Sequence, residues 1–255
     1  CLKTPFCDGK RRHMLLGRRR RMHMASRQIA AVAYGDVTGD RRVDTVRITG
    51  VKLGDGDVWE QLQLEVQNGR TGQATVLPLP AEVGYGPQLV LSPLTGTSRL
   101  DILALIQSGG SGAIIYFAVY AYQNGSFQLL LDNDAYDRTY TYRVIYENGY
   151  LVRIESNAND IGYLITVAGK GQTYLDGLYH ADGILKTPTE GFVSPASVVS
   201  PVHFSGQPQT ELMLWQLVSG QYRADGLGYV INVLRWNGTG FDLYAQTLGV
   251  ETVSE

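Results

Sequence analysis

The stretch "AAVAYGDVTGDRRVDTVRITG" at residues 30–50 joins two runs of alternating apolar and polar residues through a loop rich in Asp and Gly. Alternation with a period of two is typical of a β-strand with one buried face. A Gly-rich turn at 53–57 and a longer run, "VWEQLQLEVQNG" at 58–69, follow. Asn-Gly after an apolar run favours a type I′ hairpin turn, which needs two residues at positive φ. The segment therefore predicts an antiparallel meander of strands.

Two later segments repeat this order of strand, loop, strand, Gly-rich turn, long strand and Asn-Gly. They begin with "PQLVLSPLTGTSRLDILALIQ" at residues 87–107 and "ASVVSPVHFSGQPQTELMLWQLV" at 196–218. The asparagines of the Asn-Gly turns, Asn68, Asn124 and Asn237, are spaced by 56 and then 113 residues. A constant period of this size indicates a structural repeat. One degenerate copy, with alternating residues at 139–171, fills the gap.

Four-stranded units repeated at this length are typical of propeller blades. We therefore expect an all-β fold, a β-propeller of about four four-stranded blades, with units at residues 28–80, 81–133, 134–195 and 196–248. A fifth blade is allowed if residues 176–195 contribute strands, and a pair of β-sandwiches is the structural alternative. No stretch carries a helical period, so no helix is expected.

Residues 1–27 carry nine basic residues and one acidic residue. Like charges without an apolar period predict a disordered basic tail before a propeller at 28–255. Its positive charge also allows a contact with nucleic acid, which is the weakest of the partner hypotheses. Both cysteines, Cys1 and Cys7, lie in it, so the body has no disulfide framework. No run reaches the roughly 18 apolar residues that span a bilayer, so no transmembrane segment is expected.

The loop at residues 36–44 places carboxylates at a spacing of four. Calcium prefers six to eight oxygen ligands, which alternate residues of a tight loop can direct to one centre. The candidate metal ligands are Asp36, Thr38, Asp40, the carbonyl of Arg42, and Asp44. The alternative is a metal-free hydrogen-bonded turn. The other copies have lost the ligand set, since the three carboxylate positions are Pro93, Thr97 and Asp101 in the second copy and His203, Gln207 and Glu211 in the last. A fold that is kept while the acids are lost indicates that the loop is first of all structural.

The segments "GDVTGDRRVD" at 35–44 and "LVLSPLTGTSRLDIL" at 89–103 resemble the loops of FG-GAP or VCBS repeat proteins. That family builds β-propellers and binds calcium in loops written D-x-[DN]-x-D-G-x-x-D. Thr38 departs from this pattern where Asp or Asn is usual, and Arg41 departs where Gly is usual. The resemblance implies one bound calcium ion and a secreted protein or one associated with the cell envelope.

Aromatic residues are the second candidate site, since Tyr and Trp supply large contact areas at low entropic cost. The candidates are Tyr136, Tyr140, Tyr142, Tyr222, Tyr229 and Trp236. They would suit a protein or carbohydrate ligand; the alternative is that they line the faces between blades. The function that we expect is non-enzymatic binding or scaffolding. The rival is a carbohydrate-active or other hydrolase with carboxylates at the propeller axis.

Overall fold

The computed structural model describes residues 26–96, 99–110 and 113–250 of the 255-residue chain. The expected all-β class is confirmed, and the strands form two antiparallel sheets. The strands are β1 (Gln28–Gly35), β2 (Asp44–Lys52), β3 (Val58–Gln67), β4 (Ala74–Leu77), β5 (Gly84–Ser92), β6 (Asp101–Gln107), β7 (Ile115–Gln123), β8 (Ser126–Asp132), β9 (Tyr142–Glu147), β10 (Leu151–Ser156), β11 (Gly162–Thr166), β12 (Glu190–Val202), β13 (Glu211–Ser219), β14 (Gly226–Trp236) and β15 (Phe241–Gly249).

Each sheet contains two meanders of consecutive strands. The order in the first sheet is β1-β2-β3-β5-β6-β7-β8, with β4 also paired to β3, and the order in the second is β11-β10-β9-β12-β13-β14-β15. We name the meanders unit 1 (β1–β4), unit 2 (β5–β8), unit 3 (β9–β11) and unit 4 (β12–β15). The predicted boundary at residues 195/196 falls inside β12, which begins at Glu190.

Four separate propeller blades are not confirmed, because neighbouring units share hydrogen-bonded strands. Unit 1 joins unit 2 through a short pairing of β3 with β5, and unit 3 joins unit 4 through β9 and β12. Each junction contains a glycine. A Cβ at Gly84 would overlap Ile106, and a Cβ at Gly191 would overlap the backbone of Ser219. The missing side chain therefore lets the strand that makes the junction lie close to the next strand of its own unit.

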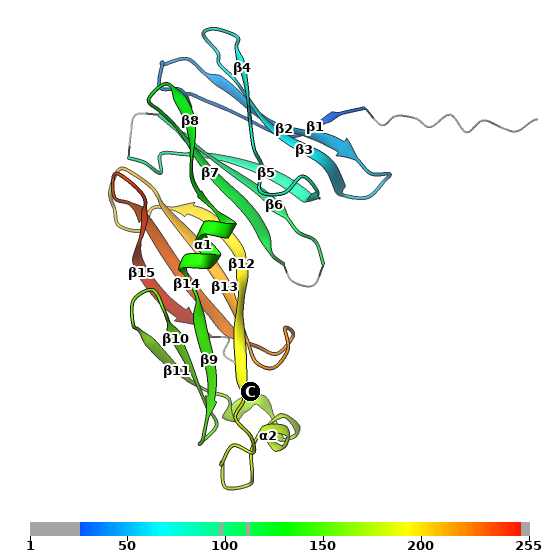
Figure 1. Ribbon diagram of the computed structural model, residues 1–255, viewed down its shortest axis with the longest axis vertical. Coiled ribbons are helices and arrows are strands. Elements are labelled where there is room, and N and C mark those ends of the chain that lie inside the picture. The colour runs from blue at the N-terminus through cyan, green and yellow to red at the C-terminus, as the bar shows by residue number, and fades with distance from the viewer. Residues whose placement is uncertain (1–25, 97–98, 111–112, 251–255) are drawn as a thin grey trace, which may run out of the picture.

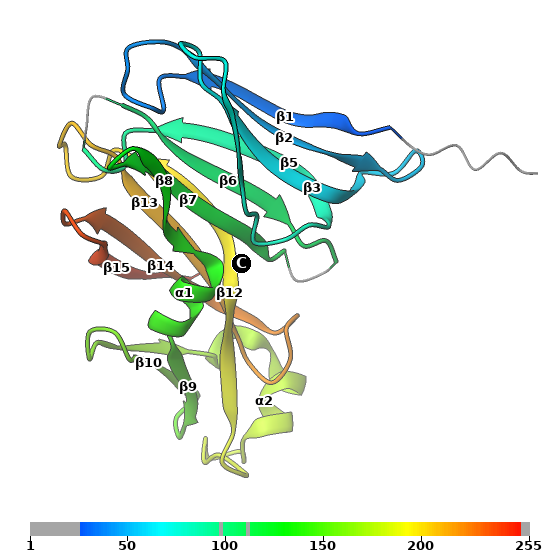
Figure 2. The same ribbon diagram turned by 45° about the horizontal axis from the view of Figure 1, so that its top comes forward.

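The four units stack along the long axis of the molecule in the order 1, 2, 4, 3 (Figures 1 and 2). Three hydrophobic cores fill the spaces between them, the first between units 1 and 2, the second between units 2 and 4, and the third between units 3 and 4. Units 2 and 4 are thus covered on both faces, whereas units 1 and 3 form the two ends of the stack.

Strand β6, "DILALIQ", illustrates the effect of this stacking on the sequence. Ile102, Ala104 and Ile106 belong to the first core, and the alternating Leu103 and Leu105 belong to the second. Because both faces are buried, the strand is a continuous apolar run rather than an alternating one.

The expectation of no helix was wrong. The structure contains α1 (Asn133–Thr139), α2 (Gln172–Leu178) and the 3₁₀ turn η1 (Ala168–Lys170). The Asp132 side chain caps α1 by accepting a hydrogen bond from the Ala135 N–H. Helices of two turns are too short to show a helical period in the sequence. In the described ranges no helix is both long and apolar enough to cross a bilayer. The predicted basic tail falls almost entirely outside these ranges.

Candidate functional site

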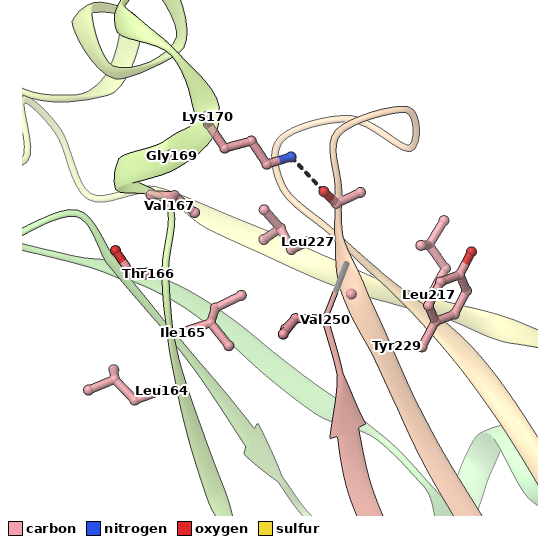
Figure 3. A pocket seen from close by; sticks show the side chains of 12 residues that line it. Leu164, Ile165, Thr166, Val167, Gly169, Lys170, Leu217, Leu227, Tyr229 and Val250 are labelled. Atoms are coloured by element: carbon pink, nitrogen blue, oxygen red, sulfur yellow. Dashed lines mark hydrogen bonds between the residues drawn. The ribbon is translucent and has the colours of Figure 1, made fainter. Parts of the chain in front are cut away.

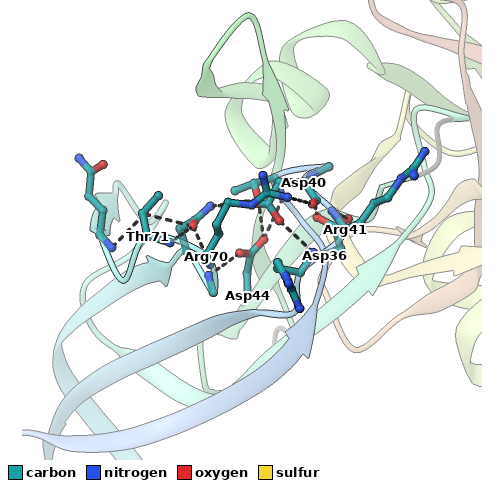
Figure 4. Close-up of polar contacts among 12 residues, drawn as sticks. Asp36, Asp40, Arg41, Asp44, Arg70 and Thr71 are labelled. Carbon is teal, nitrogen blue, oxygen red and sulfur yellow. Dashed lines mark hydrogen bonds and ion pairs between the residues drawn. The ribbon is translucent and has the colours of Figure 1, made fainter.

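Asp44 is the best-defined member of the predicted metal loop and is fully buried at the start of β2 (Figure 4). Its Oδ2 accepts hydrogen bonds from the backbone N–H groups of Val37 and Thr38, at 3.0 and 2.9 Å, and from the Thr38 hydroxyl. Its Oδ1 accepts the N–H of Gly69, in the Asn-Gly turn, at 2.9 Å. Asp44 therefore ties the β1–β2 loop to the β3–β4 turn.

The two other carboxylates of this loop also bind donors of the protein. Asp36 accepts the backbone N–H groups of Gly39 at 2.6 Å, Asp40 at 3.1 Å and Arg41 at 2.7 Å. Asp40 accepts the N–H of Arg42 at 2.9 Å and pairs with the guanidinium of Arg70 at 3.3 Å. Each carboxylate thus completes the hydrogen bonding of a local turn.

These contacts favour the metal-free turn over a calcium site, and a bound calcium ion stays a prediction. The carboxylate oxygens already accept N–H groups of the protein, and Asp40 has a guanidinium partner. Within the described residues no group of three or more acids, histidines or cysteines is placed to hold a metal ion. The geometry fits the alternative of a metal-free hydrogen-bonded turn.

We accordingly expect excess calcium and a chelator to give the same midpoint of thermal unfolding. A bound ion at a hundredfold excess over its dissociation constant would add about 2.7 kcal/mol to the free energy of unfolding. A calcium-dependent rise in the midpoint that Asp40→Asn abolishes would contradict this expectation and restore the metal site.

The position of Asp44 recurs in two other units. Asp101 and Glu211 are the first residues of β6 and β13, and both are fully buried. Asp101 accepts the Thr95 N–H at 2.7 Å, and Glu211 accepts the Phe204 N–H at 3.0 Å. The common feature of the repeat is therefore a buried carboxylate that holds the preceding loop.

The predicted aromatic site is divided between the core and separate surfaces. Tyr136 and Tyr140 are buried in the core between units 2 and 4, where they pack against each other with ring centroids 4.8 Å apart. The Tyr136 hydroxyl donates to Gln216 at 3.0 Å, and the Asn232 amide donates to the Tyr136 hydroxyl at 2.8 Å. Tyr136 and Tyr140 thus bind neighbouring units together and are not exposed to a partner.

The remaining aromatic candidates lie apart from these two. The Asn232 amide also donates to the Tyr142 hydroxyl at 2.8 Å. Trp236 packs edge-to-face on Phe241, and Tyr222 is exposed in the β13–β14 turn. Tyr229 is the one member of the predicted set that lines a large cavity.

That cavity, of about 860 Å³, lies between unit 3 and unit 4 (Figure 3). Strand β11 and η1 form one wall, the first residues of β14 form the opposite wall, and Val250 follows β15 at the rim. Most lining side chains are apolar, among them Leu164, Ile165, Val167, Leu227, Tyr229 and Val250. A pocket with apolar walls and few polar groups is the usual form of a ligand site.

A polar cluster adjoins the cavity through Lys170 of η1. The Lys170 ammonium donates to Asp225 Oδ1 at 2.9 Å and to the carbonyl of Gly226 (Figure 3 draws the latter pair). The buried Asp225 also accepts the hydroxyls of Tyr174 at 2.8 Å and Tyr146 at 3.3 Å. Burial raises the pKa of both tyrosines well above the usual value, so both hydroxyls stay protonated.

The cavity and this cluster were missed in the sequence. Asp225 lies in a stretch whose sequence is typical of a hairpin turn, and Lys170 follows the last predicted strand of the degenerate repeat. Tyr146, Tyr174 and Lys170 come from unit 3 and the segment after it, whereas Asp225 comes from unit 4. No local spacing in the sequence signals their meeting.

Fold and site together define an all-β protein of two antiparallel sheets with an apolar cavity between its last two units. The YybI C-terminal domain family matches residues 140–249, which include the whole second sheet and the cavity walls up to Gly249. The chain is also 36% identical over 230 residues to the uncharacterized protein YybI of Bacillus subtilis (strain 168), covering 90% of this chain and 88% of that protein. The chain therefore belongs to the YybI family.

This result corrects the resemblance to FG-GAP or VCBS repeat proteins. The comparisons find the YybI family and no family of those repeats. The acidic loop that suggested the resemblance is explained by the role of Asp44, since a buried carboxylate that caps a loop gives the same local pattern as a metal ligand. The calcium and propeller assignments taken from the resemblance lose this support.

Proposed function

We propose that the protein is a binding protein that holds an apolar group of its ligand in the cavity between β11, η1 and β14. The observation that carries this proposal is the cavity itself, with about 860 Å³ of space and predominantly apolar walls. Binding of apolar groups is favoured by roughly 25 cal/mol for each Å² removed from water, so a cavity of this size can supply useful affinity.

The charge at the rim specifies the ligand further. Lys170 uses two of its N–H donors for Asp225 and Gly226, and an ammonium has a third. Because Lys170 also lines the cavity, it can donate to an acceptor or an anionic group of a ligand. The proposed ligand is therefore amphiphilic, with an apolar body and an acceptor or anionic head.

Binding is favoured over the hydrolase alternative by the chemistry of the walls. The described residues that line the cavity include no Asp, Glu, His, Cys or Ser. The nearby Asp225 is occupied by an ammonium and two hydroxyls. A hydrolase needs a general base and an acid or nucleophile that reach the substrate. An extracytoplasmic location stays a prediction, and the corrected resemblance was its main support.

The test is fluorescence of anilinonaphthalene sulfonate, an apolar probe with an anionic group, on the folded native chain. We expect saturable binding that Val250→Trp weakens about tenfold by filling the rim, a loss of about 1.4 kcal/mol. Val83→Trp is the matched control, because Val83 is 53% exposed, Val250 is 52% exposed, and Val83 does not line the cavity.

A neutral analogue, N-phenylnaphthylamine, tests the apolar cavity separately from the contact between Lys170 and an anionic head. We expect it to bind the same site more weakly, since it lacks the group that Lys170 would contact. Absence of saturable binding of either probe, or equal binding by the native chain and Val250→Trp, would overturn the assignment of the cavity as the binding site.

A further inference from the structure

The sequence contains four Asn-Gly pairs, at residues 68–69, 124–125, 148–149 and 237–238. An asparagine followed by glycine can lose its side-chain amide without an enzyme, because glycine has no Cβ that hinders attack by its backbone nitrogen. The reaction requires the side-chain amide and that nitrogen to leave their other partners and meet. The hydrogen bonds around each pair therefore decide which pair reacts in the folded chain.

The pair at residues 68–69 is held at both reacting groups. Asn68 Oδ1 accepts the N–H of Thr71 at 2.7 Å. The Gly69 N–H donates to the fully buried Asp44 at 2.9 Å. A hydrogen bond to an ionised carboxylate is stronger than one between neutral groups. Attack by the Gly69 nitrogen would therefore first break the contact that ties two loops of unit 1 together.

Two further pairs are held by other segments or by their own turn. Asn148 Oδ1 accepts the N–H of Leu185 at 2.9 Å, and the N–H of the following glycine donates to the Gly183 carbonyl at 2.8 Å. Asn237 Oδ1 accepts two backbone N–H groups of its turn, at 2.8 and 2.9 Å, and its amide nitrogen donates to Asp242 at 2.6 Å. In both pairs the side-chain amide is fixed by hydrogen bonds.

The remaining pair, Asn124 and Gly125, is held at neither group. It forms the turn between β7 and β8, and both residues are exposed. Their φ angles, 50° and 85°, are positive, as a type I′ turn requires. Within the part of the chain that the structure describes, the Asn124 side chain and the Gly125 N–H have no hydrogen-bond partner. Rotation of this pair out of the turn therefore breaks no hydrogen bond of either reacting group.

We propose that Asn124 is a site of spontaneous deamidation, which converts in the folded protein while the three other pairs stay intact. The Gly125 backbone nitrogen attacks Cγ of Asn124, so an N–Cγ bond forms and the Cγ–Nδ2 bond breaks. The side-chain nitrogen leaves as ammonia with the proton of the attacking nitrogen. Water then opens the cyclic imide. Cleavage of the new N–Cγ bond gives aspartate, and cleavage of the original peptide C–N bond gives isoaspartate, in which the main chain continues through Cγ.

The isoaspartate product disturbs the hairpin of β7 and β8. The ladder of this hairpin begins at the pairing of Gln123 with Ser126, which a type I′ turn of two residues fixes. Isoaspartate adds a carbon to the main chain of the turn and so breaks the match. Strand β8 is the end of its sheet and pairs with β7 (Figure 1). The proposal therefore includes a local loosening of β8 in the isoaspartate form. It goes beyond the cavity ligand and does not depend on it.

The experiment is peptide mapping by mass spectrometry of the native full chain during incubation in mildly alkaline buffer. We expect Asn124 to convert at least about tenfold faster than the three other pairs, which corresponds to a difference of about 1.4 kcal/mol in the barrier. In urea the four pairs are expected to convert at similar rates, because unfolding removes the hydrogen bonds that separate them. Equal rates in the folded chain, faster conversion at another pair, or the same order of rates in urea would overturn the proposal.

Two variants separate the isoaspartate product from the new charge. Asn124→Asp introduces the charge without lengthening the main chain, and Asn124→Gln slows the reaction because glutamine must close a larger ring. Hydrogen exchange of β8 amides is compared between fresh and incubated samples of the native chain and of Asn124→Gln. We expect faster exchange in the incubated native chain alone, and native exchange in fresh Asn124→Asp. An equal change in the incubated Asn124→Gln chain would overturn the loosening of β8 by isoaspartate.

Discussion

Asp44→Ala is expected to lower the free energy of unfolding by about 3–5 kcal/mol, because it leaves several donors without an acceptor. Asp44 is fully buried and binds three backbone N–H groups, those of Val37, Thr38 and Gly69. A buried donor left without a partner costs about 1–3 kcal/mol, and water that enters the loosened loop recovers part of the sum. The loss is a large fraction of the roughly 5–15 kcal/mol that stabilises a typical domain.

Urea unfolding measures this loss, and Asp36→Ala is the control in the same loop. Asp36 also accepts three backbone N–H groups, but solvent reaches these bonds. Water therefore replaces the lost acceptor, and we expect a cost of about 1 kcal/mol. Equal costs for the two variants would show that Asp44 does not hold the loop through buried hydrogen bonds.

Local patterns in the sequence predicted the strands of three units well. The alternation at residues 30–50 corresponds to β1 and β2, and the Asn-Gly turns follow β3, β7 and β14. These signals are local, since a strand and its hairpin turn are specified by neighbouring residues. The way in which units join is not local. It depends on two-residue pairings such as Val58 with Tyr85, and on the room left by Gly84.

The calcium assignment of the acidic loop depended on spacing, because sequence alone gives the spacing of carboxylates and not their partners. Asp36, Asp40 and Asp44 have the spacing of calcium ligands, yet backbone N–H groups occupy them. The presence of an acid at Asp101 and Glu211, with the first two acids lost, was the useful signal, since one carboxylate is enough to hold a loop. The candidate cavity could not be predicted, because its walls come from strands that are far apart in the chain.

Asp225→Ala is the second variant with a large expected effect, a loss of about 2–3 kcal/mol in the free energy of unfolding. Removing one partner of a buried ion pair commonly costs about 3–5 kcal/mol. The cost is smaller for this pair, because the Lys170 side chain is 31% exposed and regains hydration. The hydroxyls of Tyr174 and Tyr146 lose their acceptor, but one of them can then donate to the other across the 2.7 Å between their oxygens. The same variant frees the Lys170 ammonium beside the cavity, so we expect tighter binding of anilinonaphthalene sulfonate.

A double-mutant cycle separates the ion pair from the rest of this cluster. Lys170→Met alone leaves a buried carboxylate without its cation, whereas Lys170→Met combined with Asp225→Asn leaves neutral groups that the two tyrosines can still contact. We expect the double variant to be more stable than the sum of the single losses predicts, with a coupling of about 1 kcal/mol or more. Additive losses would mean that Lys170 and Asp225 stabilise the protein independently. Lys170 would then be held at the rim by Gly226 and Tyr174 rather than by the carboxylate.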